Sequence, residues 1–322
     1  YNINSFGKWE KQHYVLIRTK SDQEILEEYK ISLETLQKKK KNWKAALLVY
    51  RNQRPRPRLD DKSLTSWNGL MMKDAYKVFG NEAYLAAALK NGKFIVENQL
   101  QPSGALYHNY KDGKSTINGY LEDYASVIEA FISLYEITLD ESWLEHSVNL
   151  TEYCFEKFYD QERGMFYFTS SDDPKLLTRS FEYRDNVIPA SNSIMAKNLF
   201  KLSHFYEASR YGETSRQMLK NVLAEMEQYP NGFSNWLDLL SNYQQDFYEV
   251  VIVGENALQF AREINATYIP NKIVAGSTGP GDSYLLKGRY SEDNTLIYVC
   301  VNNTCKLPVS NSKSALELIN TD

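Results

Sequence analysis

The sequence predicts a mainly helical protein built from helical hairpins, followed by a small α/β part. Through most of residues 1–245, apolar side chains recur at the spacing of one helix face. The predicted helices come in pairs, and long polar or extended connections separate the pairs. After Asp246, short β-branched runs replace the helical spacing. We therefore expect a helical domain over residues 1–245 and an α/β subdomain over residues 246–322.

Each predicted helix carries one apolar stripe. Trp67, Leu70 and Met71, for example, fall at positions i, i+3 and i+4 of the segment that begins at Thr65. Ser32 is a favoured N-cap residue and marks the start of the first helix. In chain order, the expected helices cover residues 32–50, 65–79, 82–100, 121–135, 142–158, 191–208, 213–228 and 233–243.

Short strands are expected in the connections and in the C-terminal part. Asp112-Gly113 lies between two short extended runs and predicts a β-hairpin over residues 104–116. Another short strand is expected within residues 164–169. In the C-terminal part, the pattern predicts a β-α-β unit and a third strand, over residues 250–253, 257–264, 272–275 and 295–301.

The helix pairs form a repeat. Trp67, Glu122 and Asn192 belong to successive units and are separated by about 55 and about 70 residues. Units of this kind bury their apolar faces only by stacking on one another, and functional residues gather in their long connections. A site is therefore expected where these connections meet the helix N-termini.

The composition disfavours several classes of protein. Lys and Arg total 37 against 41 for Asp and Glu, a poor match to nucleic-acid binding. No apolar run approaches the roughly 18 residues of a membrane span, so we expect no membrane partner.

Three cysteines are too few for a disulfide framework and are typical of a reducing, cytoplasmic compartment. Cys300 and Cys305 are expected to be reduced strand cysteines rather than a redox pair. The chain begins at Tyr1 without a Met or an apolar leader, and we expect it to be part of a longer polypeptide.

The densest group of chemical side chains precedes and opens the helix near Trp67. Asp60, Asp61 and Lys62 come just before it, and Asn68 follows Trp67. Carboxylates, a cation, an aromatic ring and an amide are the groups that bind and turn over polar small molecules. The alternative is that the acids only cap the helix or complement its dipole.

A second group opens the helix at residue 121. Glu122 and Asp123 lie in its first turn between Tyr120 and Tyr124. Two carboxylates that face one cleft can divide into an acid and a base when burial or repulsion separates their pKa values. First-turn acids that serve the helix dipole are again the alternative.

Two further residues are candidates for ligand contact. His108 lies in the predicted hairpin and can line a cleft. Asn192 follows the N-cap Ser191, and its amide suits the recognition of hydroxyl groups.

Patterns for metal and cofactor sites are missing. The four histidines have no ligand spacing, and Cys300 and Cys305 lack a second pair for a zinc site. No serine lies in a G-x-S-x-G turn, and Gly254 is not part of a G-x-G-x-x-G fingerprint. We expect no metal and no cofactor.

Several motifs together resemble one protein family. These motifs are Arg-Pro-Arg-Leu-Asp-Asp-Lys62, Thr-Ser-Trp-Asn-Gly-Leu-Met71, Leu-Glu-Asp-Tyr-Ala125, Pro-Ala-Ser-Asn-Ser193 and the run from Cys300 through Cys305 to Pro308. In this order and spacing, they resemble the large thioredoxin-domain-containing family that includes spermatogenesis-associated animal proteins.

The resemblance implies a fold and a partner domain. Family members carry a thioredoxin-like domain before the region that corresponds to this chain, and we expect that domain as a partner within the full-length protein. The rest resembles an (α/α)6 toroid of the six-hairpin glycosidase and N-acylglucosamine 2-epimerase type. A closed ring of six hairpins needs about twelve helices, so the ring is either open here or completed by sequence outside this chain. By position in the motifs, the residues that would line the cavity are Asp60, Asp61, Lys62, Trp67, Asn68, Glu122, Asp123, Tyr124 and Asn192.

The leading hypothesis is a carbohydrate-active or carbohydrate-binding toroid with a sugar as its small-molecule ligand. In a glycoside hydrolase-like reaction, the catalytic groups would come from Asp61, Glu122 and Asp123. The substrate-binding candidates are Asp60, Lys62, Trp67, Asn68, His108, Tyr120, Tyr124 and Asn192. The alternative is a non-catalytic scaffold or binding module that serves the thioredoxin-like domain. A sugar epimerase is less favoured, because no histidine is expected at a helix mouth.

Overall fold

The computed structural model describes residues 7–9, 13–72, 80–174, 177–206, 209–302 and 304–319. The chain divides into two compact units, residues Tyr1–Asp60 and Asp61–Asp322. Each unit is described by itself.

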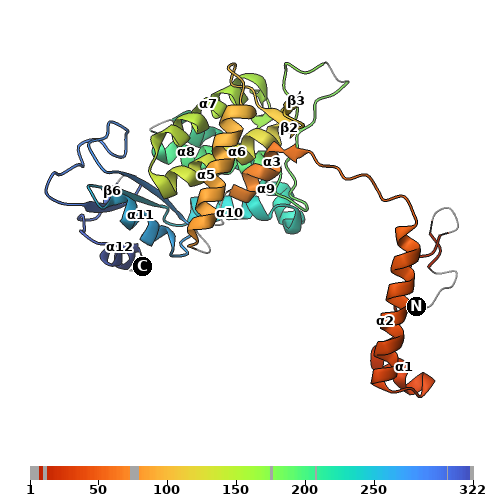
Figure 1. Ribbon diagram of the computed structural model, residues 1–322. Coiled ribbons are helices and arrows are strands. Elements are labelled where there is room, and N and C mark those ends of the chain that lie inside the picture. Colours follow the sequence, from red (N-terminus) through yellow and green to blue (C-terminus); the bar gives the residue numbers. More distant parts are fainter. Residues whose placement is uncertain are drawn as a thin grey trace. The chain divides into compact units, whose positions relative to one another are not determined.

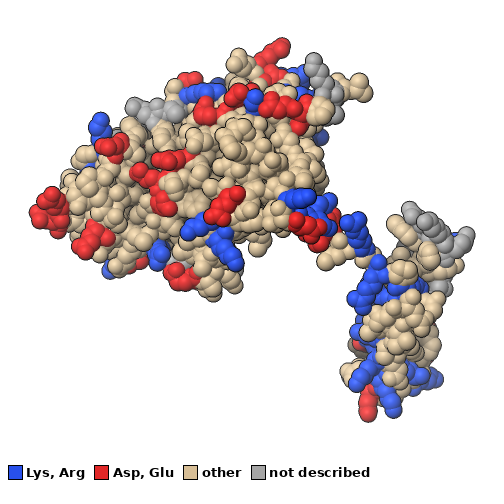
Figure 2. All heavy atoms as spheres, turned by 45° about the horizontal axis from the view of Figure 1, so that its top comes forward, with Lys and Arg blue, Asp and Glu red and all other residues tan. Residues whose placement is uncertain are grey.

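The first unit contains the helices α1 (Asp22–Tyr29) and α2 (Leu33–Asn52) (Figure 1). Ser32 Oγ accepts a hydrogen bond from the backbone N–H of Thr35 at 3.2 Å, which confirms the predicted N-cap. Leu36 is the buried residue of α2, and Lys and Arg side chains cover much of the unit's surface (Figure 2). Lys40 is paired with Asp22 at 2.7 Å.

Helical hairpins make up most of the second unit (Figure 1). The pairs are α3 (Thr65–Met72) with α5 (Glu82–Asn98), α6 (Leu121–Thr138) with α7 (Glu141–Lys157), and α8 (Ser191–Phe205) with α9 (Ser209–Gln228). Helix α6 packs against both α3 and α8, and nearly every residue along it is buried. The first helices of the three pairs therefore form one layer, with α6 in the middle, and the second helix of each pair packs against that layer.

The predicted helices are present with small differences at their ends. Helix α3 begins at Thr65 as expected, while residues 73–79 of the predicted helix lie outside the described residues. After α9 come the short helix η3 (Pro230–Gly232) and α10 (Ser234–Gln244). The mainly helical class and the serial hairpins are confirmed.

Small antiparallel sheets lie in the long connections. Strands β1 (Ser63–Leu64), β2 (Tyr107–Lys111) and β3 (Lys114–Asn118) pair in that order, and β4 (Tyr159–Asp160) pairs with β5 (Met165–Phe166). Asp112 and Gly113 both have positive φ, 51° and 79°, as a tight two-residue turn requires. The predicted hairpin is therefore confirmed.

The C-terminal part is a four-stranded mixed sheet with two helices. Its elements are β6 (Tyr248–Val253), α11 (Ala257–Asn265), β7 (Lys272–Ser277), β8 (Leu296–Val301), β9 (Thr304–Cys305) and α12 (Ser312–Ile319). The strand order is β7-β6-β8-β9, with β6 and β7 parallel, so the predicted β-α-β unit is confirmed. Val251 and Val253 share a core with the helical hairpins, whereas Val250 and Ile252 share a second core with α11 and α12. The domain boundary at residue 245 stays a prediction.

The two C-terminal cysteines correct one expectation. Cys300 on β8 and Cys305 on β9 are directly opposite in the strand register and form a disulfide. The prediction of two reduced cysteines was wrong, because the turn after Val301 folds β9 back onto β8 and brings the two sulfurs together. Cys154 is a free, buried cysteine on α7.

No helix within the described part of the chain is both long enough and apolar enough to cross a membrane.

Candidate functional site

Three titratable side chains meet where α6 begins. Glu122 and Asp123 lie in the first turn of α6, and His108 comes from the neighbouring strand β2. One polar atom of each lies within 4.8 Å of the others. Among the described residues, these three side chains form the group of His, Cys, Asp and Glu that lies close enough together to hold a metal ion.

Asp123 holds this cluster together. Its carboxylate is fully buried, and Oδ1 accepts a hydrogen bond from the backbone N–H of Ser66 at the start of α3, at 2.9 Å. Oδ2 accepts from the backbone N–H of Tyr120, also at 2.9 Å, which caps α6. Burial raises the pKa of Asp123, and these hydrogen bonds to the carboxylate oppose that rise. Asp123 thus joins the starts of two neighbouring helices.

His108 is positioned by the same carboxylate. Its Nδ1 lies 2.9 Å from Asp123 Oδ2. The hydrogen bond with Asp123 raises the pKa of His108, and burial together with the charge of Lys62 opposes this. Because Nδ1 is engaged, Nε2 is the ring nitrogen left to exchange a proton with another group.

Glu122 has a pKa near neutral pH, where a carboxyl group can both donate and accept a proton. Its half-buried carboxyl has a pKa raised from 4.5 to about 7, first by burial and then by the charges of Asp123 and Glu182. Glu182 accepts a hydrogen bond from the backbone N–H of Ser191 at the start of α8, at 3.0 Å. The site thus draws on the beginnings of α3, α6 and α8.

Aromatic rings border the cluster. Tyr120 stacks on Phe168 with 5.1 Å between ring centroids, and its ring meets His108 edge-on at 5.0 Å. Trp67 directly follows Ser66, and its side chain is 61% exposed.

Other predicted site residues lie on the surface. Asp61 is exposed and forms an ion pair with Lys111, which lowers the pKa of Asp61. Asp60 belongs to the first unit. Lys62 is exposed and acts on His108 through its charge. The structure therefore does not bring Asp61 into the buried carboxylate cluster.

Three further candidates make structural hydrogen bonds. Asn68 Nδ2 donates to the carbonyl of Leu64 at 2.7 Å, within its own helix start. The fully buried Tyr124 accepts a hydrogen bond at its hydroxyl from the backbone N–H of Leu106, at 2.8 Å. The fully buried Asn192 accepts from the N–H of Phe166 and donates to the carbonyls of Phe166 and Glu182, at 2.8 to 2.9 Å. These contacts account for all three residues without a ligand.

Sequence reasoning missed the role of several neighbours. Glu182 and Phe168 lie in the connection before α8, which carries no motif that marks them. It also placed no histidine at a helix mouth and gave no ligand spacing to the histidines. Both statements need correction, because β2 carries His108 to the mouth of α6, within reach of two carboxylates.

The residues of this cluster fit a proton-transfer site better than a metal site. Both oxygens of Asp123 already accept backbone N–H groups, and Oδ2 also faces His108 Nδ1. A metal would have to compete with these hydrogen bonds for the Asp123 carboxylate.

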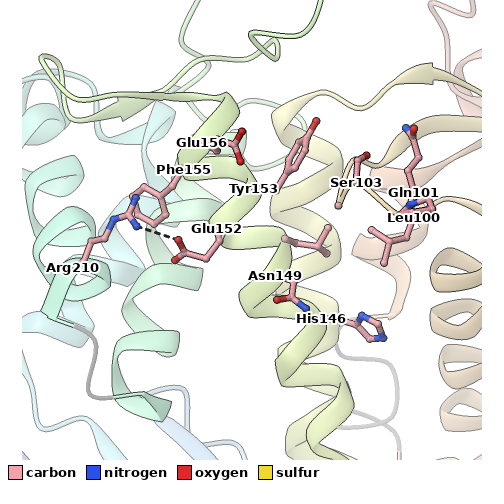
Figure 3. A pocket seen from close by; sticks show the side chains of 13 residues that line it. Leu100, Gln101, Ser103, His146, Asn149, Glu152, Tyr153, Phe155, Glu156 and Arg210 are labelled. Carbon is pink, nitrogen blue, oxygen red and sulfur yellow. Dashed lines mark hydrogen bonds and ion pairs between the residues drawn. The ribbon is translucent and has the colours of Figure 1, made fainter.

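A groove away from this cluster lies along α7. This groove has a volume of about 710 Å³ and lies between residues 100–104 on one side and Arg210 of α9 on the other (Figure 3). Glu152 is paired there with Arg210 at 3.1 Å, and the Arg210 guanidinium lies 3.7 Å from the Phe155 ring centroid. No residue predicted for the site lines this groove.

Proteins with similar sequences include the spermatogenesis-associated proteins that the motifs of this chain resemble. No protein-family model matches the sequence. Human spermatogenesis-associated protein 20 is 27% identical over 288 residues, which cover 82% of this chain and 37% of the human protein. The chain is a homologue of this protein. The mouse protein of the same name is 28% identical with 82% and 36% coverage, and an uncharacterised protein of Caenorhabditis elegans is 27% identical with 96% and 45% coverage. The chain spans less than half the length of these relatives.

Solved structures with some likeness to the chain include two sugar-processing enzymes. A GH76 α-mannanase of Bacteroides thetaiotaomicron matches with a TM-score of 0.47 and 15% identity, over 70% of this chain and 66% of that one. Cellobiose 2-epimerase of Bacillus thermoamylovorans matches with a TM-score of 0.42 and 15% identity, over 51% and 45%.

Proposed function

We propose that the cluster at the mouth of α6 is an acid–base site that acts on a carbohydrate. The observation that carries the proposal is the carboxyl of Glu122, with a pKa of about 7, beside a histidine that a buried aspartate orients. A proton-transfer group works best when its pKa lies near the working pH.

The two exchangeable groups have separate roles. Glu122 accepts a proton from the substrate or donates one to it, since both of its forms are populated near neutral pH. His108 is the second proton carrier through Nε2. Asp123 is a positioning residue, because its oxygens are buried and engaged by His108 and by backbone N–H groups.

This assignment differs from a hydrolase that pairs Asp61, Glu122 and Asp123. Two carboxylates that hydrolyse a glycoside must both reach the substrate. Asp123 is fully buried, and Asp61 is engaged in an exposed ion pair with Lys111. The geometry therefore favours Glu122 with His108 as the pair that moves protons.

A polyhydroxylated ring is the substrate class that fits the surroundings best. Sugar rings present flat apolar faces to aromatic side chains and hydroxyl groups to polar ones. Tyr120 lies against His108, and Trp67 presents an exposed ring beside the start of α3.

The test begins with a thermal-shift screen of the chain against mono- and disaccharides, because a ligand of the native state raises its melting temperature. Any sugar that binds is then incubated with the protein, and products are followed by NMR. Glu122→Gln and His108→Gln should each abolish turnover, whereas Asp61→Asn and the exposed-site control Glu97→Gln should retain it.

Two results would decide against this assignment. Turnover that survives both Glu122→Gln and His108→Gln would remove these groups from the chemistry. Binding of a sugar without any turnover would favour a binding module that serves a further domain of the full-length protein.

A further inference from the structure

The disulfide at the edge of the C-terminal sheet has an unusual neighbour. Arg289 directs one guanidinium nitrogen at each sulfur: Nη1 lies 3.5 Å from Cys300 Sγ, and Nη2 lies 3.5 Å from Cys305 Sγ. The guanidinium also lies over the ring of Tyr298, 5.0 Å from its centroid, and Tyr298 Oη donates to the backbone carbonyl of Arg289. Tyr298 thus helps to hold the cation beside both sulfurs.

The two sulfurs differ in access. Cys300 is fully buried, whereas Cys305 is exposed on the edge strand β9. Exposed disulfides are the ones that exchange readily with thiols, and a nearby arginine stabilises a cysteine as its thiolate. Glu249, the cross-strand neighbour of Cys300, is engaged by His204 at 2.8 Å.

We propose that Cys300 and Cys305 form a thiol–disulfide exchange site that takes two electrons from a dithiol partner. This site is separate from the acid–base cluster and does not depend on its function.

The reaction follows from the geometry. A thiolate of the partner attacks Cys305 Sγ, the sulfur that solvent reaches. The bond to Cys300 breaks, and Cys300 leaves as a thiolate beside Arg289 Nη1. The second partner thiol, once deprotonated, attacks the partner sulfur of the mixed disulfide and releases the Cys305 thiolate beside Nη2. The partner is oxidised to a disulfide, the pair is reduced, and the two partner protons pass through solvent to the released sulfurs.

The site can be tested with dithiothreitol as the dithiol. The native chain is equilibrated at defined ratios of reduced to oxidised dithiothreitol, quenched with acid and freed of dithiothreitol. It is then denatured, alkylated, and analysed by peptide mass spectrometry. Cys300 and Cys305 should become reduced and alkylated together. Cys154, the free cysteine, should be alkylated at every ratio and serves as the labelling control.

Arg289→Gln should lower the equilibrium constant for reduction about tenfold, which corresponds to about 30 mV for a two-electron couple. Lys287→Gln, which removes an exposed charge two residues away, is the matched control and should behave as the unchanged chain. Circular dichroism verifies that both variants are folded. Equal constants for the two variants would remove Arg289 from the mechanism. A disulfide that dithiothreitol reduces only after denaturation would identify a structural crosslink and overturn the proposal.

The order of attack has its own test. With glutathione disulfide, Cys300→Ser leaves the exposed Cys305 and should form the mixed disulfide quickly, whereas Cys305→Ser leaves the buried Cys300 and should react slowly. Equal rates, or faster reaction at Cys300, would contradict attack at Cys305.

Discussion

Glu122→Gln should stabilise the folded chain at alkaline pH. Burial and neighbouring charges raise the pKa of Glu122 from 4.5 to about 7, so folding is opposed wherever this carboxyl must be ionised. A glutamine of the same shape carries no charge and removes that cost. The proposed general acid or base is thus expected to weaken the fold that holds it.

The magnitude follows from the size of the shift. A rise from 4.5 to about 7 corresponds to about 3.5 kcal/mol at about 1.4 kcal/mol per pH unit. Solvent screens the half-buried side chain, so we expect about half of this, roughly 1.7 kcal/mol, as the gain of the variant above pH 8. Because the folded-state pKa is the higher one, the protonated form is favoured by folding. The contribution of protonated Glu122 to the unfolding free energy is complete below pH 4.5 and is lost as the pH rises through about 7.

The assay is urea unfolding of both proteins at pH 4.5, 6, 7 and 8.5, with the difference in unfolding free energy plotted against pH. The difference should be near zero at the acid end and should grow between pH 5 and pH 8. Glu97→Gln, at an exposed position of α5, should give a flat line. A flat line for Glu122→Gln as well would refute the raised pKa and with it the proton-transfer role.

Three further predictions concern the frame of the site. His108→Gln should destabilise the chain more at acid than at alkaline pH. The hydrogen bond with Asp123 raises the pKa of His108 in the folded state, and this stabilisation is lost as the pH rises above that pKa. Urea unfolding at pH 5.5 and pH 9 measures the loss of unfolding free energy, and an equal loss at both pH values would contradict the pairing. Asn192→Ala leaves the buried backbone N–H and carbonyl of Phe166 without the side-chain amide that pairs with them and should cost about 2 to 4 kcal/mol, seen as a lower urea midpoint; a loss under about 0.5 kcal/mol would refute this role. Gly69→Ala should cost about 1 to 3 kcal/mol and lower the melting temperature, because a Cβ there would lie 2.8 Å from the backbone of α6. In the control Gly212→Ala in α9, the added Cβ meets its nearest atoms at 3.4 Å, so a thermal melt should show a neutral or stabilising effect.

The sequence determined most of the local structure. Helix starts and faces depend on nearby residues, so Ser32 could be identified as an N-cap and Asp112-Gly113 as a hairpin turn from spacing alone. The change from helical spacing to β-branched runs likewise located the β-α-β unit that begins with β6. The group of acids at the start of α6 was found for the same reason.

Only the tertiary structure decided what these acids do. Glu122 and Asp123 are adjacent in the sequence, but a helix turns adjacent residues by about 100°, so one carboxylate is fully buried under the start of α3 and the other remains half-buried. His108 reaches Asp123 because β2 folds back on the mouth of α6, and no spacing rule encodes that approach.

The cysteines show the same division. Their separation of five residues gave no redox motif, yet β8 and β9 place them opposite each other, and a separate loop places Arg289 beside both sulfurs. Residue type and spacing set which local elements form, whereas burial and the charges that surround a group set its pKa and reactivity. Those surroundings come from segments distant in the chain, and they exist only once the helices and strands have packed.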